Sequence, residues 1–365
     1  MKAIVLAGGY ATRLRPITYA LPKLLFPVLG KPMIFWTLDL LKEVGVDEVV
    51  LGVNYLADTL RNEVGSDYDG IEVKYSSEKA PLGTAGPIKL ASEATRLSET
   101  FFAMNGDVIA NIDLKMLLAQ HRQSGALVTD ALYEVKDPTR FGVVQLDNGR
   151  HIKRFVEKPT AKKAPSRLVN AGIYVMEPEV LEMIPANRKV SLEREIFPLL
   201  VRDEKLGGFP FGGDWFDIGS LADYREANFS LLAKRAKEHR LHDTNVQVEK
   251  GAILRPPVIL GEGSKVRNGV TVGPQLIGGK GTFFGERARA TKSIFFDDVS
   301  IGEDAIIAGS ILASGVSVGK RARIDAGSIV SPNVKIGDRV RIGRNAIVHP
   351  YKEIETNVKP GSHVM

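Results

Sequence analysis

Residues 318–348, VGKRARIDAGSIVSPNVKIGDRVRIGRNAIV, carry an aliphatic residue at every sixth position. The same spacing of six begins at residue 306. The aliphatic residues at this spacing are Ile306, Leu312, Val318, Ile324, Val330, Ile336, Ile342 and Val348. This period is typical of a parallel β-helix, in which each inward side chain stacks on its equivalent in the next coil. A β-sandwich would show alternation by two and irregular turn spacing. The pattern therefore predicts a β-helix of hexapeptide repeats.

The same step of six occurs earlier in the chain, at Leu260, Val266 and Val272, before residues 282–296, TFFGERARATKSIFF, interrupt it. Before these repeats, residues 221–240, LADYREANFSLLAKRAKEHR, have the pattern of a helix. A chain of 365 residues exceeds the usual size of one domain. We predict an α/β domain at 1–240, with a linker helix near 221–240, followed by a left-handed parallel β-helix domain at 241–365.

In the first half of the chain, short apolar runs alternate with helical patterns. The predicted strands contain KAIVLA at 2–7, EVVLGV at 48–53, IEVKY at 71–75 and TFFAMN at 100–105. Most of these runs are nearly continuous in apolar residues, which is typical of parallel strands covered on both faces. Residues 141–159 predict an antiparallel hairpin, because Asp147-Asn148-Gly149 is strong turn chemistry. The fold class expected is a Rossmann-like, mainly parallel sheet with an antiparallel addition.

Two helices are predicted between these strands from their end signals. Residues 31–45 carry an apolar stripe, with Pro32 as the first helical residue and Gly45 as a stop. Residues 111–125 repeat the pattern, with Asp113 as the N-cap and Gly125 as the terminator.

The composition excludes several classes of function. Cysteine is absent, which removes disulfides, thiolate metal sites and cysteine nucleophiles. No apolar run approaches the length of a membrane span and no signal-peptide pattern is present, so we expect a cytoplasmic protein with no membrane partner. Of the net charge of +6, most lies in residues 241–365, where Lys and Arg are spaced singly between apolar residues. We therefore expect no nucleic-acid partner.

A glycine-rich stretch, LAGGYATRLRP at residues 6–16, follows the first predicted strand. Glycine lets the main chain approach phosphate closely. The spacing fits neither the P-loop motif nor the dinucleotide-binding motif. The stretch alone therefore leaves its ligand open.

Several short motifs occur in an order that resembles a known enzyme family. They are LAGGYATRLRPITYALPKLL at 6–25, EKAPLGTAGPI at 78–88, NGDVI at 105–109, RFGVV at 140–144, FVEKP at 155–159, NAGIYVM at 170–176 and WFDIGS at 215–220. Together they resemble the sugar-1-phosphate nucleotidyltransferases over essentially the whole chain. The similarity is strongest to the mannose-1-phosphate guanylyltransferases, also called GDP-mannose pyrophosphorylases, which also carry a hexapeptide β-helix. The resemblance implies nucleotidyl transfer from a nucleoside triphosphate to a sugar 1-phosphate, with release of pyrophosphate.

The resemblance implies a role for each motif. Arg13, Lys23, Asp107 and Asp217 would be catalytic, with Arg13 on the leaving side of the triphosphate and Lys23 near the α-phosphate. The implied nucleotide-binding residues are Leu6, Gly8, Gly9, Arg13, Glu78, Pro81 and Gly83. The implied sugar-phosphate residues are Gly142, Glu157, Lys158, Asn170 and Gly172. Arginine and lysine suit a reaction between anions, since catalysis then consists mainly of charge neutralisation and in-line positioning.

The implied cofactor is Mg²⁺, bound by Asp107 and Asp217. Mg²⁺ prefers one or two carboxylates together with substrate phosphates and water. For Asp217, a role as a loop or capping residue before the helix start at Ser220 is the alternative. Mn²⁺ or Co²⁺ suits the same oxygen ligands.

Glu78 predicts guanine as the base, provided that its side chain points inward. The guanine edge offers two parallel donors, which one carboxylate can accept together. Adenine presents an acceptor at that edge, and relatives that use uridine or thymidine nucleotides often have glutamine at this position. GTP is therefore the favoured donor, with UTP, dTTP or ATP as alternatives. The resemblance implies mannose 1-phosphate as the acceptor, with glucose 1-phosphate as the alternative.

Two positions depart from the family pattern. Ala11 stands where the family usually has glycine, and its methyl group would crowd phosphate or strain a left-handed backbone. Leu24 stands where proline usually follows the motif lysine. One alternative is a weakly catalytic, regulatory relative that senses nucleotide-sugar. Acetyl transfer by the β-helix is disfavoured, because His242, His349 and His363 lie outside mid-repeat loops. The expected role of the β-helix is homo-oligomer assembly.

Overall fold

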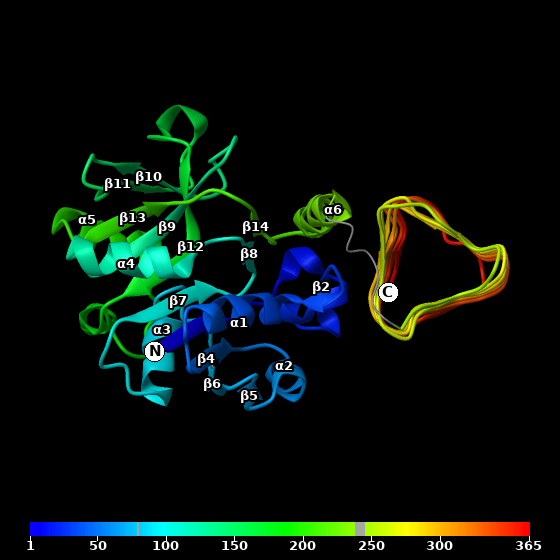
Figure 1. The fold of residues 1–365 in the computed structure, drawn as a ribbon, viewed down its shortest axis with the longest axis horizontal. Helices are drawn as coiled ribbons and strands as arrows, with labels where there is room; N and C mark the ends of the chain where they lie inside the picture. Colours follow the sequence, from blue (N-terminus) through cyan, green and yellow to red (C-terminus); the bar gives the residue numbers. More distant parts are fainter. Residues whose placement is uncertain (79, 238–244) are drawn as a thin grey trace. The chain divides into compact units, whose positions relative to one another are not determined.

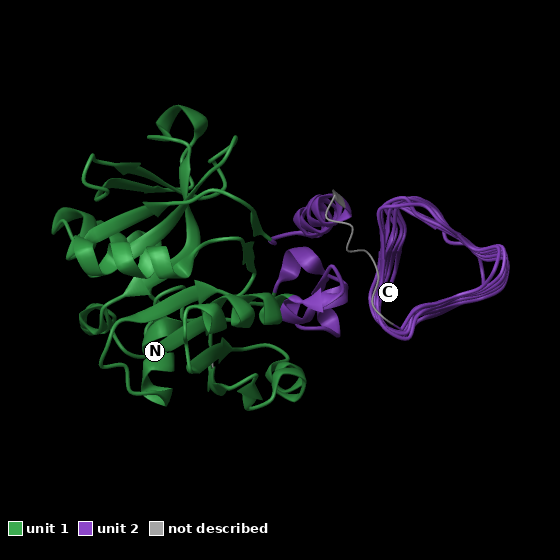
Figure 2. Ribbon diagram, in the orientation of Figure 1, with its two compact units in different colours: residues 1–10, 33–217 green, residues 11–32, 218–365 purple. Residues whose placement is uncertain are grey.

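A computed structural model describes residues 1–78, 80–237 and 245–365, which form two compact units (Figures 1 and 2). The first unit comprises residues 1–10 and 33–217, and the second comprises residues 11–32 and 218–365. The glycine-rich stretch is thus shared between the units. The predicted domain boundary at 240, the predicted last turn of the linker helix and His242 lie outside the described residues, so the division at 240 stays a prediction.

The first unit is built on a 10-stranded sheet flanked by helices (Figure 1). Its strands, with the β8–β14 ribbon, are β1 (Lys2–Leu6), β4 (Glu48–Val53), β5 (Asp67–Tyr68), β6 (Ile71–Ser77), β7 (Phe101–Asn105), β8 (Val108–Ala110), β9 (Val128–Glu134), β10 (Gly142–Leu146), β11 (Ile152–Glu157), β12 (Leu168–Met176), β13 (Leu206–Pro210) and β14 (Trp215–Asp217). Its helices are α1 (Met33–Glu43), α2 (Ala57–Val64), α3 (Gly86–Ala94), α4 (Leu114–Ser124) and α5 (Phe197–Arg202), with 3-10 turns η4 (Ala161–Lys163) and η5 (Pro178–Met183) and a π-helix η6 (Leu192–Ile196).

Parallel strands form the centre of this sheet, in the order β7-β1-β4-β6. The chain leaves β1 toward β4 and β6 and returns to pair β7 on the other side of β1. Strand β12 then pairs antiparallel with β7, and β10 and β9 pair antiparallel with β12. Ligands of open α/β sheets bind at the carboxyl ends of the strands where the order reverses. The ends of β1 and β7 are that position here.

The predicted elements of this unit are largely confirmed. The four predicted strands are β1, β4, β6 and β7, and the predicted hairpin is β10–β11. Asp113 caps α4, because its carboxylate accepts hydrogen bonds from the backbone N–H groups of Lys115 and Met116. The prediction for Pro32 is wrong: it still pairs with Pro27 in extended backbone, and the helix begins at Met33.

The second unit contains short N-terminal elements, one long helix and the coils. They are η1 (Thr12–Leu14), η2 (Ile17–Tyr19), η3 (Lys23–Leu25), β2 (Pro27–Val28), β3 (Lys31–Pro32) and α6 (Leu221–Lys237). The coil strands are β15 (Gln247–Val248), β16 (Ile253–Leu254), β17 (Val258–Leu260), β18 (Lys265–Val266), β19 (Thr271–Val272), β20 (Leu276–Gly278), β21 (Phe283–Phe284), β22 (Arg289–Thr291), β23 (Ser293–Phe295), β24 (Ser300–Ile301), β25 (Ile306–Ala308), β26 (Ile311–Leu312), β27 (Ser317–Val318), β28 (Arg323–Ile324), β29 (Ile329–Val330), β30 (Lys335–Ile336), β31 (Arg341–Ile342), β32 (Ile347–Val348), β33 (Glu353–Ile354) and β34 (His363–Val364).

These coil strands stack into three parallel sheets that form the sides of a β-helix, as the hexad period predicts (Figure 1). The predicted inward residues are buried in one core, with one exception. Ile306 is 38% exposed, while its neighbour Ile307 is buried in that core. The prediction is off by one residue there because the inward step shortens to five between Ile307 and Leu312.

The step of six is interrupted within residues 282–296, as predicted, although the β-helix itself is not. The coils continue through these residues, with Phe284, Ala290 and Phe295 as inward residues. The step of six is kept up to Ala290 and shortens to five before Phe295. Gly278 lies opposite Leu260, so the residue six positions after Val272 has no aliphatic side chain.

Residues 11–32 and α6 pack on one outer face of the β-helix. Phe26, Tyr224 and Phe296 pack edge to face, with Phe26 5.6 Å from each of the other two ring centroids. The Tyr224 hydroxyl donates to the carbonyl oxygen of Pro27, and Asn228 Oδ1 accepts from the backbone N–H of Leu29. The segment that carries Arg13 and Lys23 is therefore held in part by side chains of the second half of the chain.

Candidate active site

The aspartates predicted to bind metal are brought together by a two-stranded ribbon. Strand β8 begins directly after Asp107 and pairs antiparallel with β14, so that Val108 lies opposite Asp217. The Trp215 indole N–H donates to the carbonyl oxygen of Ala171 at 3.0 Å, which ties the ribbon to β12. Ser220, not Asp217, caps α6, since its hydroxyl oxygen accepts from the backbone N–H of Asp223. The alternative role of Asp217 as the cap of this helix is therefore not the one observed.

Both aspartates line a single cavity together with every predicted sugar-phosphate residue. Its walls come from β7, β8, β10, β11, β12, η6 and β14. The lining residues are Asn105, Asp107, Val108, Arg140, Phe141, Gly142, Glu157, Lys158, Asn170, Ala171, Gly172, Tyr174, Glu193, Trp215 and Asp217. The cavity therefore combines carboxylates, amides and cations at the carboxyl end of β7.

Glu157 and Lys158 form an ion pair at the end of β11, with Lys158 Nζ 3.5 Å from Glu157 Oε1. The Glu157 side chain is 19% exposed and that of Lys158 62% exposed. Burial, and then the negative charge of Glu193, raise the pKa of Glu157, and the Lys158 charge opposes this shift. Glu157 thus provides a half-buried hydrogen-bond acceptor. The long, exposed side chain of Lys158 beside it can place its positive charge on a phosphate.

Asn170 is held in place by its neighbours on β12. Its Oδ1 accepts from the backbone N–H of Gly172 at 2.7 Å, and its side chain exchanges hydrogen bonds with the buried hydroxyl of Tyr174. Gly172 has φ +75°, and a Cβ there would lie 2.5 Å from Asn105 Nδ2. Only glycine allows Asn105 to approach this closely. The Asn170 amide is therefore held in position by its own strand, and Gly172 leaves room for Asn105 beside it.

Glu78 points toward the glycine-rich stretch. A Cβ on Gly8 would lie 2.6 Å from Glu78 Oε1, so glycine at position 8 makes room for this carboxylate. The other oxygen accepts from the backbone N–H of Leu82 at 2.9 Å. Burial raises the pKa of Glu78. The inward orientation that the guanine prediction required is therefore present.

The remaining predicted nucleotide residues lie at the end of β1 and in the segment that follows β6. Leu6 ends β1, and Gly9 follows it as an exposed residue. Pro81 is exposed, and Gly83 forms a bridge with Val190. These positions belong to the first unit.

Arg13 and Lys23 lie in the second unit. Arg13 is exposed in η1, and a Cβ on Gly219 would lie 3.0 Å from its guanidinium. Lys23 begins η3 and is half-buried. Ala11 has φ 42° and ψ 45°, so the expected strain of a left-handed backbone at this non-glycine position is confirmed.

Sequence reasoning missed Glu193 and Asn105. Glu193 lies on the π-helix η6, and its Oε2 accepts from the hydroxyls of Thr84 and Ser191, each at 2.6 Å. Its stretch, SLEREIF, has an ordinary helical composition and no distinguishing signal. Asn105 is part of the NGDVI motif, but only the aspartate of that motif was assigned a role from the sequence.

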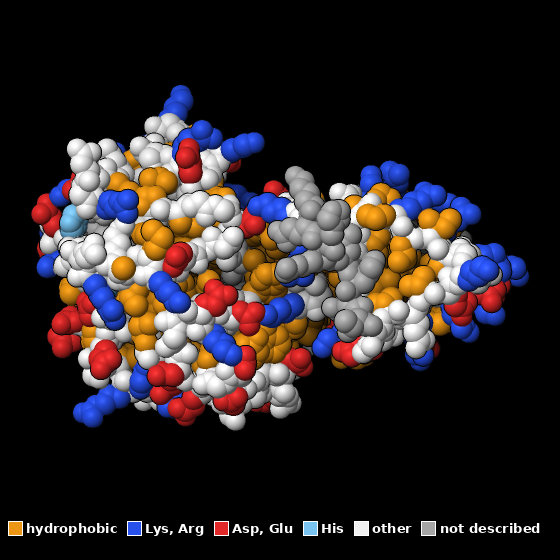
Figure 3. Space-filling view, in the orientation of Figure 1, with side chains coloured by type: hydrophobic (Ala, Val, Ile, Leu, Met, Phe, Trp, Pro, Cys, Tyr) orange, Lys and Arg blue, Asp and Glu red, His pale blue; other side chains and the backbone are white. Residues whose placement is uncertain are grey.

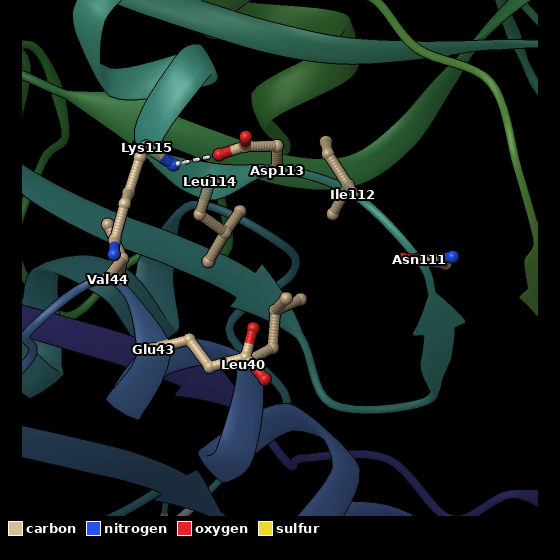
Figure 4. A pocket seen from close by; sticks show the side chains of 8 residues that line it. All are labelled: Leu40, Glu43, Val44, Asn111, Ile112, Asp113, Leu114 and Lys115. Atoms are coloured by element: carbon tan, nitrogen blue, oxygen red, sulfur yellow. Dashed lines mark hydrogen bonds between the residues drawn. The ribbon is translucent and has the colours of Figure 1, made fainter.

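A separate cavity of about 510 Å³ lies between the end of α1 and the start of α4 (Figure 4). None of the predicted site residues lines it. Its most prominent carboxylate, Asp113, is engaged as the N-cap of α4, and Figure 4 shows the hydrogen bond from Lys115. The cavity is thus distinct from the candidate active site.

The donor set fits a divalent cation that is held partly by substrate. Among the described residues, no group of three or more His, Cys, Asp or Glu side chains is arranged to hold a metal alone. Asp107 and Asp217 supply two carboxylates at one cavity, which is what Mg²⁺ requires when phosphates complete its coordination.

Comparisons with known proteins agree with this site. The Nucleotidyl transferase family model matches residues 2–234, and the GMPPB C-terminal domain model matches residues 254–364. The chain belongs to the nucleotidyl transferase family. A mannose-1-phosphate guanylyltransferase 1 of Arabidopsis thaliana is 34% identical over 330 residues, and a probable mannose-1-phosphate guanylyltransferase 2 of Oryza sativa subsp. japonica is 35% identical over 330 residues. Each alignment covers 89% of this chain and 89% of the relative.

A mannose-1-phosphate guanyltransferase of Candida albicans is 33% identical over 333 residues, again covering 89% of both chains. Among solved structures, a putative glucose-1-phosphate thymidylyltransferase of Bacillus anthracis in complex with a sucrose matches with a TM-score of 0.57 and 27% identity. It covers 62% of this chain and 94% of that one. The chain is thus a sugar-1-phosphate nucleotidyltransferase whose curated relatives are mannose-1-phosphate guanylyltransferases.

No helix in the described residues is both long and apolar enough to span a membrane. On the face that Figure 3 shows, Lys and Arg side chains are interspersed with Asp and Glu side chains over the first unit.

Proposed function

We propose that this enzyme transfers GMP from GTP to mannose 1-phosphate, giving GDP-mannose and pyrophosphate. The observation that carries the proposal is the single cavity that both aspartates share with Glu157, Lys158 and Asn170. Its chemistry suits a phosphorylated sugar. The Lys158 ammonium can bind the phosphate, and the side chains of Glu157 and Asn170 beside it can form hydrogen bonds with the sugar hydroxyls. The curated relatives, named as mannose-1-phosphate guanylyltransferases, support the choice of substrates.

In the proposed reaction, a phosphate oxygen of the sugar 1-phosphate bonds to the α-phosphorus of GTP while the bond to the β-phosphate oxygen breaks. Lys158 binds the phosphate of the attacking sugar 1-phosphate, and the Glu157 carboxylate accepts hydrogen bonds from hydroxyls of the sugar ring. Arg13 binds the departing pyrophosphate, and Lys23 neutralises charge on the α-phosphate. These groups act mainly by positioning and by electrostatic stabilisation.

Asp107 and Asp217 would hold Mg²⁺. When bound, the ion supplies charge stabilisation to the phosphates. Replacing either one with asparagine should weaken metal-dependent nucleotide binding.

Glu78 would select guanine. Its carboxylate lies against Gly8 and is partly buried, so it can accept both donors of the guanine edge at the end of β1. A Glu78→Gln variant should lose most of the preference for GTP over UTP and dTTP. An unchanged preference in this variant would refute the assignment of the base.

The decisive experiment is pyrophosphate release with Mg²⁺, pairing GTP, ATP, UTP and dTTP with mannose 1-phosphate and glucose 1-phosphate. Strongest release with GTP and mannose 1-phosphate is expected. Strongest release with another base would keep the reaction class and overturn the guanine assignment. Folded protein that binds nucleotide-sugar and releases no pyrophosphate would instead support the regulatory alternative.

Matched variants test the metal ligands. Asp107→Asn and Asp217→Asn should each reduce turnover by at least about 100-fold, the scale seen when a group that stabilises transition-state charge is lost. Asp214→Asn is the control, because Asp214 adjoins β14 and does not line the cavity. Equal loss in the control would show that the ribbon, not the carboxylates, is being disturbed.

We also propose that the β-helix assembles the enzyme into a homo-oligomer and that the protein is cytoplasmic. The stacked coils offer a long, rigid surface suited to assembly. Light scattering of the purified protein tests the first point.

A further inference from the structure

Two tyrosines stand beside the glycine-rich stretch with much of their surface exposed. Tyr10 is 48% exposed and Tyr55 is 41% exposed. Their ring centroids lie 6.1 Å apart, with an interplanar angle of 46°. Large aromatic side chains usually bury most of their surface, so a neighbouring pair this exposed offers apolar faces to a ligand.

The two tyrosines extend from adjacent parallel strands. Tyr10 follows β1 and Tyr55 follows β4. These two strands pair in parallel, and the backbone N–H of Ala7, directly after β1, donates a 2.9 Å hydrogen bond to the carbonyl oxygen of Gly52 in β4. The rings therefore stand at the carboxyl edge of the sheet, where ligands of this architecture bind.

Glu78 lies at the same edge, after the next strand, β6. Its backbone N–H donates to the carbonyl oxygen of Val53 at 3.1 Å, and its carboxylate lies against Gly8. A hydrogen-bonding edge and aromatic faces thus occur side by side on three neighbouring strand ends. A nucleobase needs this combination, since its edge carries donors and acceptors and its face is a π-system.

We propose that Tyr10 and Tyr55 form an aromatic platform that stacks on the base of the nucleoside triphosphate while Glu78 accepts from the base edge. This inference rests on the proposed function, because it deepens the account of the same nucleotide site. The platform supplies affinity for any base, and Glu78 supplies the choice among bases. The two contributions are separable, since stacking tolerates base identity and edge hydrogen bonding does not.

The test is equilibrium binding of GTP, ITP and UTP to full-length protein by calorimetry, with no sugar phosphate present. Tyr10→Leu and Tyr55→Leu should each weaken GTP binding about fivefold or more, the lower range for loss of one base–aromatic contact. The ratio of GTP to ITP affinity should stay unchanged. Tyr10→Phe and Tyr55→Phe should bind GTP as the parent does, because the ring is retained.

Tyr351→Leu is the control, since Tyr351 is also exposed but belongs to the β-helix. GTP affinity within twofold of the parent in the Tyr10→Leu, Tyr55→Leu double variant would overturn the platform. Equal losses in the Phe and Leu variants would also overturn it, because the hydroxyl would then be the contact. If the parent prefers UTP, the guanine assignment fails, while weaker UTP binding in the Leu variants still supports stacking.

Discussion

The hydroxyl of Thr84 donates a 2.6 Å hydrogen bond to Oε2 of Glu193. The same hydroxyl oxygen accepts from the backbone N–H of Leu192 at 2.9 Å. Thr84 belongs to the segment that carries Glu78, whereas Glu193 lines the proposed sugar cavity. One side chain therefore connects the proposed base site to the proposed sugar site.

Loss of this connection should impair sugar binding first. Thr84→Val keeps the shape of the side chain but removes both of its hydrogen bonds. Glu193 then keeps only the hydrogen bond from the Ser191 hydroxyl and is held less firmly in the cavity wall. We expect the KM for the sugar 1-phosphate to rise about tenfold, with a smaller change in the KM for GTP. Thr84→Ser is the control and should behave as the parent. Steady-state kinetics in both substrates measures the difference, and equal changes in the two KM values would contradict this order of effects.

The affinity for sugar phosphate should depend on the ionisation of Glu157. Its pKa is raised, first by burial and then by Glu193, so protonation begins at a higher pH than for an ordinary glutamate. As the pH falls through this raised pKa, the carboxylate acceptor is lost and the KM for the sugar phosphate should rise.

Glu193→Gln removes the neighbouring charge and should move this rise to lower pH. The sugar phosphate has its own ionisation near pH 6, which is common to all variants, so differences between variants report the protein. Exposed Glu182→Gln should leave the profile unchanged. A Glu193→Gln profile that superposes on the parent would show that the two carboxylates are not coupled.

Asp130 should make stability fall as the pH rises. It is fully buried in β9, and neither carboxylate oxygen has a hydrogen-bond partner among the described residues. Burial raises its pKa well above the usual value of 3.8. The native state therefore retains a proton that the unfolded chain releases once the pH exceeds about 3.9. Stability is highest below that pH and decreases as the pH rises through the raised pKa.

Asp130→Asn should remove this dependence. The melting temperature of the variant minus that of the parent is expected to increase between pH 5 and pH 8. Asp58→Asn is the control, because the Asp58 side chain is 92% exposed. Parallel melting profiles for Asp130→Asn and the parent would contradict the protonated state.

Position 11 should accept a substitution by glycine but not by a β-branched residue. Its left-handed backbone is held by hydrogen bonds to its carbonyl oxygen from Leu14 N–H and from the Thr18 hydroxyl. Glycine relieves strain of about 1 kcal/mol, which the greater freedom of the unfolded chain largely offsets. Ala11→Gly should therefore change the free energy of unfolding little and retain activity, whereas Ala11→Val should lose both stability and activity. Denaturant unfolding with an activity assay tests this, and an inactive Ala11→Gly would contradict it.

Phe296→Ala should destabilise the packing of residues 11–32 on the β-helix. Phe296 is 1% exposed and packs edge to face on Phe26 and Tyr224. Loss of a buried phenylalanine costs about 3–5 kcal/mol. The KM for GTP should also rise, because this segment carries Arg13 and Lys23. Half-buried Phe283→Ala on another face of the β-helix should cost less and leave KM unchanged; the reverse order would contradict the packing argument.

The sequence predicted those features that repeat or that lie close together along the chain. The β-helix was predictable because each coil buries the same inward position, and α4 because Asp113 and Gly125 stand at its ends. The prediction for Ile306 was wrong because a coil shortens by one residue there, which a fixed interval cannot follow. Asp107 and Asp217 were predicted from motif resemblance. The pairing of β8 with β14 is what brings these two residues, far apart in the chain, to one cavity.

Chain order and side-chain type were enough to determine the parallel strands and the hexapeptide coils, because local periodicity reports which face of each element is buried. The residues of a phosphate-handling site were predicted from the resemblance of short motifs to a known family. Only the tertiary structure decided which distant residues meet. Glu193 enters the sugar cavity through Thr84, Glu78 turns toward Gly8, and residues 11–32 pack against the β-helix. These contacts join segments far apart in the chain, and they depend on strand pairing and side-chain packing that no local pattern encodes.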